Sequence, residues 1–147
     1  MKKFVFSLEK VLSFKQQTLN IQLNELTLLQ MKLKELEKEI DDLNLVFAQT
    51  NQKMVEELKT GLPSNDYLIY KMYFNTLNQK IQKRIDDKNQ LLEVIAQKKE
   101  DVVVVNSEIS GFEKLRDKQL EEYLKKRQKS EELAMDEYVN QARGSAS

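Results

Sequence analysis

Apolar residues recur at a spacing close to 3.5 residues through the first sixty residues, and no other feature limits the fold as strongly. Stepping alternately four and three residues from Leu8 to Glu57 gives positions of which about eleven in fifteen are apolar. A seam that continues over roughly seven heptads predicts a helix that packs along a second helix in a coiled coil. The positions are Leu8, Leu12, Lys15, Leu19, Gln22, Leu26, Leu29, Leu33, Leu36, Ile40, Leu43, Phe47, Thr50, Met54 and Glu57.

A second seam of the same spacing follows, and a short break separates it from the first. In the break, Gly61 can take the left-handed conformation that ends a helix, Pro63 prevents continuation, and Ser64 or Asn65 can cap a new helix. A break of about five residues suits two antiparallel helices. The second seam comprises Tyr67, Tyr70, Phe74, Leu77, Ile81, Arg84, Lys88, Leu91, Ile95, Lys98, Val102, Val105, Ile109, Phe112 and Arg116.

The two seams predict an all-α fold, a long antiparallel two-helix coiled-coil hairpin. We expect one domain over residues 1–143, with a helix at 5–59, a turn at 60–64, a helix at 65–142, and a frayed tail at 144–147. Facing residues should have numbers that add up to about 124, which places Leu43 near Ile81 and Leu19 near Val105. The second helix should overhang the first by about 25 residues, beginning near Arg116.

The composition argues against an enzyme. Of 147 residues none is Cys or His, and the 24 basic and 24 acidic residues cancel. This leaves neither thiolate chemistry nor the commonest metal ligand, so we expect no catalysis, metal or cofactor. With no net basic field and no long apolar run, we expect neither nucleic-acid binding nor membrane insertion. The carboxylate pairs at 41–42 and 86–87 lie outside the seam and are interpreted as solvated.

Polar residues interrupt both seams, and apolar residues lie outside them. We interpret the first set as fixing register and orientation, at a cost in stability, although a functional contact is the alternative. The second set predicts an exposed apolar patch that suits a partner, although scattered apolar residues are equally ordinary. The polar seam residues are Lys15, Gln22, Thr50, Glu57, Arg84, Lys88 and Lys98, and the patch comprises Ile21, Leu28, Val103 and Val104.

Two further segments are candidates for contact. Aromatic residues cluster at 67–74, mostly at seam positions, and Tyr73 beside the seam is the member most free to touch a partner. Basic residues are frequent at 114–129, but interleaved acids reduce the net charge to about +3. This favours a protein surface over nucleic acid as the partner.

Read together, several short motifs resemble the FliJ family, the small coiled-coil component of the flagellar type III export apparatus. The resemblance spans nearly the whole chain, and its weight comes from the order and spacing of the motifs. They are Phe6-Ser7-Leu8-x-x-Val11-Leu12 near the start, Gly61-x-x-Ser64-Asn65 at the turn, Tyr70 and Thr76-Leu77 after it, and Met135-Asp136-Glu137 near the end.

The resemblance implies a non-catalytic stalk similar to the γ subunit of rotary ATPases, acting in protein transport, flagellum assembly and motility. Its partners would be the hexameric export ATPase FliI, the export gate protein FlhA and export chaperones, and its place the cytoplasmic side, peripheral at the inner face of the cell membrane. The family's gate contacts fall at Tyr73, Leu77, Lys80 and Arg84, where Lys80 replaces a small residue and Arg84 a histidine. The ATPase-facing tip would carry Phe4, Phe6, Lys118, Lys125, Lys126 and Arg127.

A coiled-coil chaperone of the prefoldin kind, or another coiled-coil adaptor, is the alternative. Prefoldin-like subunits usually carry one or two β-hairpins between their helices, and residues 61–65 are too few to hold one. Substantial strand content would favour this alternative.

Overall fold

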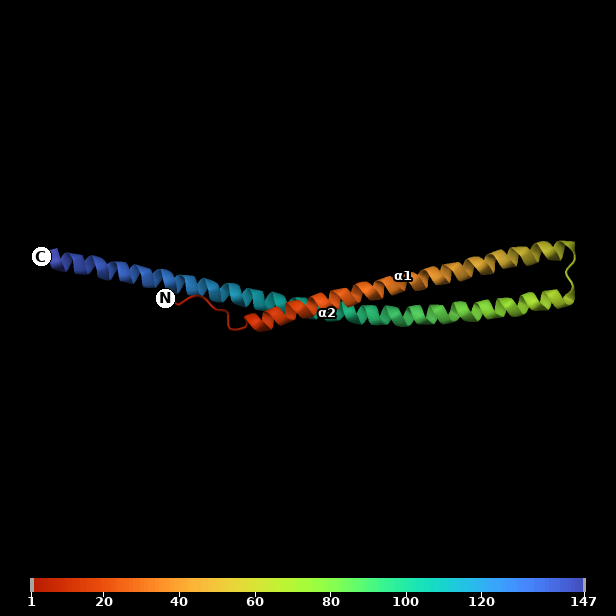
Figure 1. Cartoon of the computed structure of the whole chain (residues 1–147), viewed down its shortest axis with the longest axis horizontal. Coiled ribbons are helices and arrows are strands. Elements are labelled where there is room, and N and C mark those ends of the chain that lie inside the picture. The colour runs from red at the N-terminus through yellow and green to blue at the C-terminus, as the bar shows by residue number, and fades with distance from the viewer. Residues whose placement is uncertain (1, 147) are drawn as a thin grey trace. The chain divides into compact units, whose positions relative to one another are not determined.

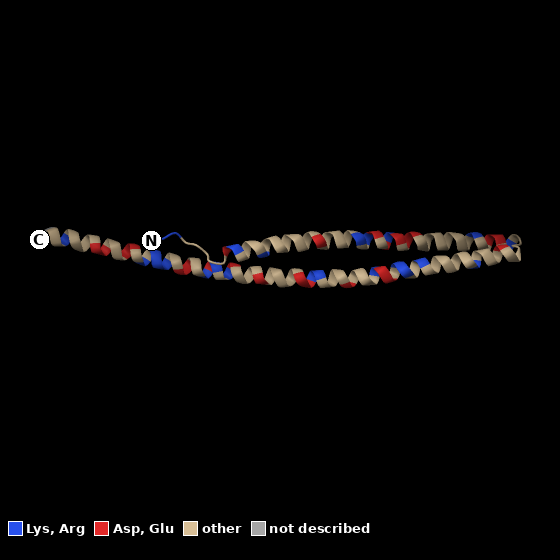
Figure 2. Ribbon diagram, turned by 60° about the horizontal axis from the view of Figure 1, so that its bottom comes forward, with Lys and Arg blue, Asp and Glu red and all other residues tan. Residues whose placement is uncertain are grey.

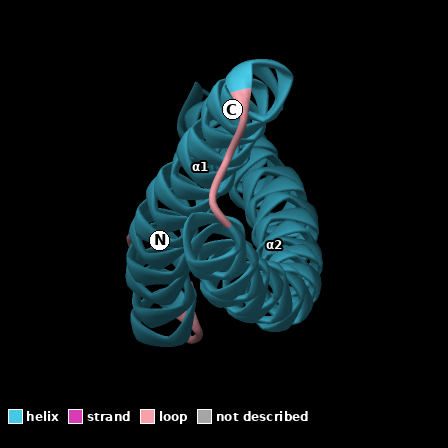
Figure 3. Ribbon diagram, turned by 90° about the vertical axis from the view of Figure 1, so that its right-hand side faces the viewer, coloured by secondary structure: helices cyan, strands magenta, loops and turns pink. Residues whose placement is uncertain are grey.

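The computed structural model describes residues 2–146, which form two long helices packed against each other as a helical hairpin. Helix α1 spans Glu9–Thr60, and helix α2 spans Ser64–Ala146 (Figure 1). Within the described residues there is helix and loop but no strand, as Figure 3 shows. The predicted all-α fold class is confirmed.

The first helix begins at Glu9, four residues later than the sequence suggested. Residues 2–8, which we name the strap, are not helical. Phe6 is buried and Phe4 packs against the same core. In a helix, side chains two residues apart point about 200° apart, whereas in an extended segment they point to the same side. The strap therefore lets both rings reach one core, which a helix from Val5 would prevent.

The turn occupies residues 61–63, and α2 begins at Ser64 because the carbonyl of Pro63 already accepts a hydrogen bond from the Tyr67 N–H at 3.1 Å. Gly61 has φ = +102°, the left-handed conformation that the sequence indicated. At the other end α2 continues to Ala146, so the described part of the predicted tail is helical. Ser147 lies outside the described residues.

The chain divides into two compact units, and each helix contributes to both. The described part of unit 1 comprises residues 2–21 and 102–146, and unit 2 comprises residues 22–101. The core of unit 1 contains Phe6, Leu12, Val105 and Ile109, with Phe4, Leu8, Leu19 and Phe112 packed against it. The main core of unit 2 contains Met54, Phe74 and Leu77, with Leu43, Phe47, Leu62 and Tyr70 around it.

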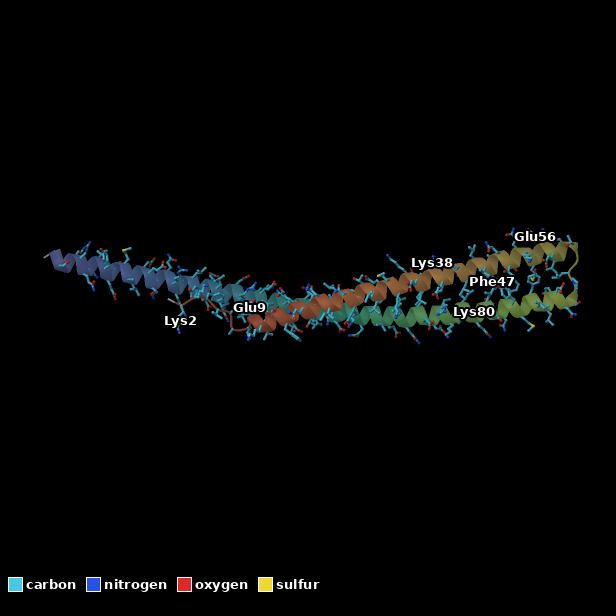
Figure 4. All side chains as sticks on the ribbon, viewed as in Figure 1. Lys2, Glu9, Lys38, Phe47, Glu56 and Lys80 are labelled. Carbon is cyan, nitrogen blue, oxygen red and sulfur yellow. The ribbon has the colours of Figure 1, made fainter. Side chains whose placement is uncertain are left out.

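In each unit, taken separately, the residues that meet across the two helices follow the predicted antiparallel register. Unit 1 pairs Lys15 with Glu108 and Arg116 with Glu9. Unit 2 pairs Lys98 with Glu25, and it packs the rings of Phe47 and Phe74 against each other at a tilt, with centroids 4.8 Å apart. The residue numbers in each pair add up to about 124, as the sequence predicts. In Figure 4 Phe47 lies on the side of α1 that faces α2.

Candidate partner-binding surfaces

Charged residues at seam positions of unit 2 turn outward and pair with acids on α1. Arg84 contacts Glu39 at 3.1 Å, Lys88 contacts Glu37 at 3.8 Å, and Lys98 contacts Glu25. The hydrogen bond to Glu25 raises the pKa of Lys98, although desolvation opposes it. Because these side chains are satisfied within the hairpin, the contacts favour the register interpretation over a functional one.

The remaining polar seam positions behave differently from one another. Tyr70 donates its hydroxyl to Glu57 at 2.8 Å, and this hydrogen bond raises the pKa of Tyr70. Lys15 pairs with Glu108 in unit 1. Gln22 has a buried side-chain oxygen with no hydrogen-bond partner among the described residues, and Thr50 is half-buried. With Arg84, Lys88 and Lys98, cross-helix contacts thus occupy five of the seven polar seam positions.

The four residues assigned to gate binding differ in how much of each side chain is exposed. Leu77 is only 4% exposed, inside the unit 2 core, so it cannot contact a partner while the helices stay packed. Its burial follows from its place in the second seam. Tyr73 is 43% exposed and Lys80 is exposed, whereas Arg84 is half-exposed and held by Glu39 and Asp87.

Lys80 and Arg84 line a shallow hollow of about 490 Å³ that the sequence did not identify. Its other walls come from both helices, since the antiparallel register brings Glu39 and Asp42, which flank the first seam, beside these cations. The additional lining residues are Glu39, Asp42, Leu43 and Lys83. The mixture of charges suits polar contacts better than apolar ones.

The residues assigned to the ATPase-facing tip belong to unit 1 and also differ in burial. Lys118, Lys125, Lys126 and Arg127 are exposed on α2. Lys125 pairs with Glu121 at 3.2 Å and Arg127 with Glu131 at 3.3 Å, each one helical turn away. Phe6, by contrast, is 5% exposed and belongs to the core, because Leu12 and Ile109 enclose it. Phe4 is half-buried.

The apolar residues outside the seams are exposed, as the sequence predicted. In unit 1, Ile21, Val103 and Val104 are between 56% and 67% exposed, and in unit 2 Leu28 is 63% exposed. Leu28 lies in an apolar groove of about 700 Å³. The groove is lined by Glu25, Leu28, Leu29, Met31, Lys32, Glu35, Val94 and Lys98. Met31 and Val94 were not singled out from the sequence, although both are apolar and lie outside the seams, as Leu28 does.

Within residues 2–146, no group of three or more Asp, Glu, His or Cys side chains is arranged to hold a metal ion. No described helix is both long enough and apolar enough to cross a membrane.

The described residues thus form a helical hairpin whose charged seam residues pair across the two helices. This arrangement fits the class of coiled-coil proteins. A family model described as Flagellar FliJ protein matches residues 4–146. The chain therefore belongs to the FliJ family, a non-catalytic component of flagellar protein export. Comparison with curated proteins and with solved structures found no match.

Proposed function

We propose that this chain is the stalk of the flagellar export apparatus that links the hexameric export ATPase FliI to the export gate protein FlhA. The observation that carries the proposal is the difference in helix length, 52 residues in α1 against 83 in α2. Every residue from 124 to 143 is exposed, so no side chain of this stretch of α2 enters the core of unit 1. A long exposed helix end suits insertion into another protein.

In this proposal the ATPase meets the end of unit 1 that carries the strap and the cations at 118–127. Purified chain should bind the matching ATPase and stimulate its turnover, and deletion of the gene should reduce motility. Absence of binding and stimulation, together with normal motility of the deletion strain, would contradict the stalk function.

The gate is proposed to meet the early part of α2 through the exposed side chains of Tyr73 and Lys80, because Arg84 is paired within the hairpin. Gate binding would also keep the chain peripheral at the inner face of the cell membrane. Tyr73→Ala, which changes an exposed ring, should weaken binding to FlhA while leaving ATPase stimulation intact. Tyr67→Ala, at a similarly exposed tyrosine six residues earlier on α2, is the control. If both variants lose the same amount of FlhA binding, the gate does not recognise Tyr73 specifically.

Escort of export chaperones is the second activity that we propose, because the apolar groove at Leu28 and Met31 remains open in unit 2. Leu28→Glu should abolish chaperone capture without affecting the helix content, since the side chain is exposed. Leu45→Glu, at another exposed α1 position, is the control. Capture that survives Leu28→Glu would assign the escort role elsewhere.

A further inference from the structure

The strap is held on α2 by three contacts, all within unit 1. The ring of Phe4 lies on the ring of Tyr123 with centroids 5.6 Å apart. The hydroxyl of Tyr123 donates a hydrogen bond to the carbonyl of Lys2. Phe6 is buried against Ile109 and Leu12. Tyr123 therefore fixes where the beginning of the chain lies along α2.

The strap brings lysines to a stretch of α2 that already carries cations. Figure 2 shows basic residues both at the beginning of the strap and on the neighbouring part of α2. Lys3 closes one side of a hollow of about 370 Å³ above α2. The residues that line it are Lys3, Tyr123, Arg127, Ser130, Glu131 and Ala134. The hollow depends on the strap, because the other five residues share one helix face.

Helix geometry sorts the charges of this stretch into two faces. Since successive residues turn by about 100°, Lys126 and Arg127 point within about 60° of Tyr123, whereas Glu121 and Glu132 point to the opposite side. Glu131 is the acid nearest to the hollow, and it pairs with the Nε of Arg127. Lys3, Lys126 and Arg127 therefore outnumber the acids on the face that the strap covers.

We propose that this hollow, which the strap completes, receives a carboxylate side chain from an acidic surface of a partner protein. The inference rests on the proposed function, in which this end of the chain meets the export ATPase. Arg127 offers the planar donors that suit a carboxylate, while Lys3 adds a point charge and Ser130 a hydroxyl. Tyr123 is a positioning residue, because it places Lys3 without itself carrying charge.

A protein carboxylate fits better than a phosphate-dense surface. Glu131 remains inside the hollow and would repel a continuous row of phosphates, whereas a single carboxylate can avoid it. The chain as a whole has a formal net charge of zero, so it has no long-range field that would attract an anionic membrane or a nucleic acid. The selectivity must then come from the local arrangement.

The test compares charge reversals inside and outside the hollow in the full-length chain. The double variant Lys3→Glu with Arg127→Glu reverses two cations of the hollow, and Lys114→Glu with Lys129→Glu is a matched reversal of two exposed cations on other faces of α2. We expect the first to weaken binding to purified export ATPase at least about tenfold at low salt and to flatten its salt dependence. The second should weaken it by less than about threefold. Tyr123→Ala should resemble the first, although it changes no charge.

Binding to an immobilised peptide whose glutamates are isolated from one another by alanines, and to phosphatidylserine vesicles, separates this inference from the proposed function. Should wild-type chain fail to bind the ATPase, the stalk function fails, and the glutamate peptide then tests the hollow alone. Retention of wild type but not of Lys3→Glu with Arg127→Glu supports the carboxylate site. Equal retention of the two, equal losses for the two charge reversals, or preferential binding to the vesicles would each overturn it. Unchanged far-UV circular dichroism confirms that the variants fold.

Discussion

The two units close their cores with different kinds of segment. Unit 2 is closed by the turn at residues 61–63, where Gly61 takes a left-handed conformation and Leu62 packs on the core. Unit 1 is closed by the strap, whose Phe6 is buried against residues more than ninety positions away, Val105 and Ile109. A turn is enforced by backbone preference, whereas a strap depends on side-chain burial. Unit 1 should therefore be the more sensitive to loss of a single side chain.

Leu12→Ala should have the largest effect, because Leu12 is 0% exposed at the centre of the unit 1 core. Removing a fully buried leucine leaves a cavity, so we expect the free energy of unfolding to fall by about 3 kcal/mol in urea denaturation. Val11→Ala, at an exposed neighbour on the same turn, is the control. Equal losses for both variants would mean that the unit 1 core does not limit stability.

Phe6→Ala removes the anchor of the strap, and we expect a loss of about 2 kcal/mol because the strap can partly detach and relieve the cavity. Hydrogen exchange should quicken around Ile109 and remain unchanged around Phe74, which lies in the other unit. Val5→Ala, at a 79% exposed position of the strap, should change the free energy by less than about 0.5 kcal/mol. Faster exchange at Phe74 would show that the cores are coupled.

Gly61→Ala tests the turn of unit 2. A methyl group at this position meets no atom within 4 Å, so the cost comes from the backbone conformation at φ = +102° alone. We expect a loss of about 1 kcal/mol. Gly111→Ala is a matched substitution inside α2, also in open space, and it should stabilise the chain by a similar amount. Thermal unfolding should therefore shift in opposite directions for the two variants.

The smallest effect concerns Tyr70. Its pKa is raised first by the hydrogen bond to Glu57, then by desolvation, and by the charges of Glu57 and Asp66. A folded-state pKa above the unfolded value means that the contribution is present below about pH 10 and is lost as the pH rises through the folded pKa. Tyr70→Phe should lower thermal stability less than Gly61→Ala does, and it should flatten the decline above about pH 10. An unchanged alkaline decline would assign that decline to other groups.

The contrast between turn and strap also explains what the sequence could predict. Gly61 and Pro63 signal a turn by themselves, and the heptad seams then determine which residues face each other, so the hairpin and its register followed from local patterns. The strap did not follow from local patterns, because Phe4 and Phe6 pack against Tyr123 and Ile109, which lie far along the chain. Their spacing of two residues was the available signal, since it favours an extended segment.

For the candidate surfaces, the sequence predicted which side chains are exposed better than it predicted which of them line the same hollow. The exposure of Val103 and Val104 followed from their places outside the seam. The burial of Leu77 follows in the same way from its place within the second seam, although the family resemblance assigned it to gate binding. The hollow that joins Lys80 to Asp42 depends on how long side chains reach across two helices, which spacing along one helix does not reveal. The same holds for Lys3 beside Arg127.

The cross-helix ion pairs of unit 2 have a mechanical consequence. In the observed register Arg84 and Lys98 meet Glu39 and Glu25. If α2 slid along α1 by one heptad in one direction, Lys98 would come opposite Lys32. If it slid by one heptad in the other direction, Arg84 would come opposite Lys32. Like charges at close range oppose both movements. The charge pattern of this unit therefore opposes sliding of one helix along the other and favours the observed register when the helices are pulled along their axes.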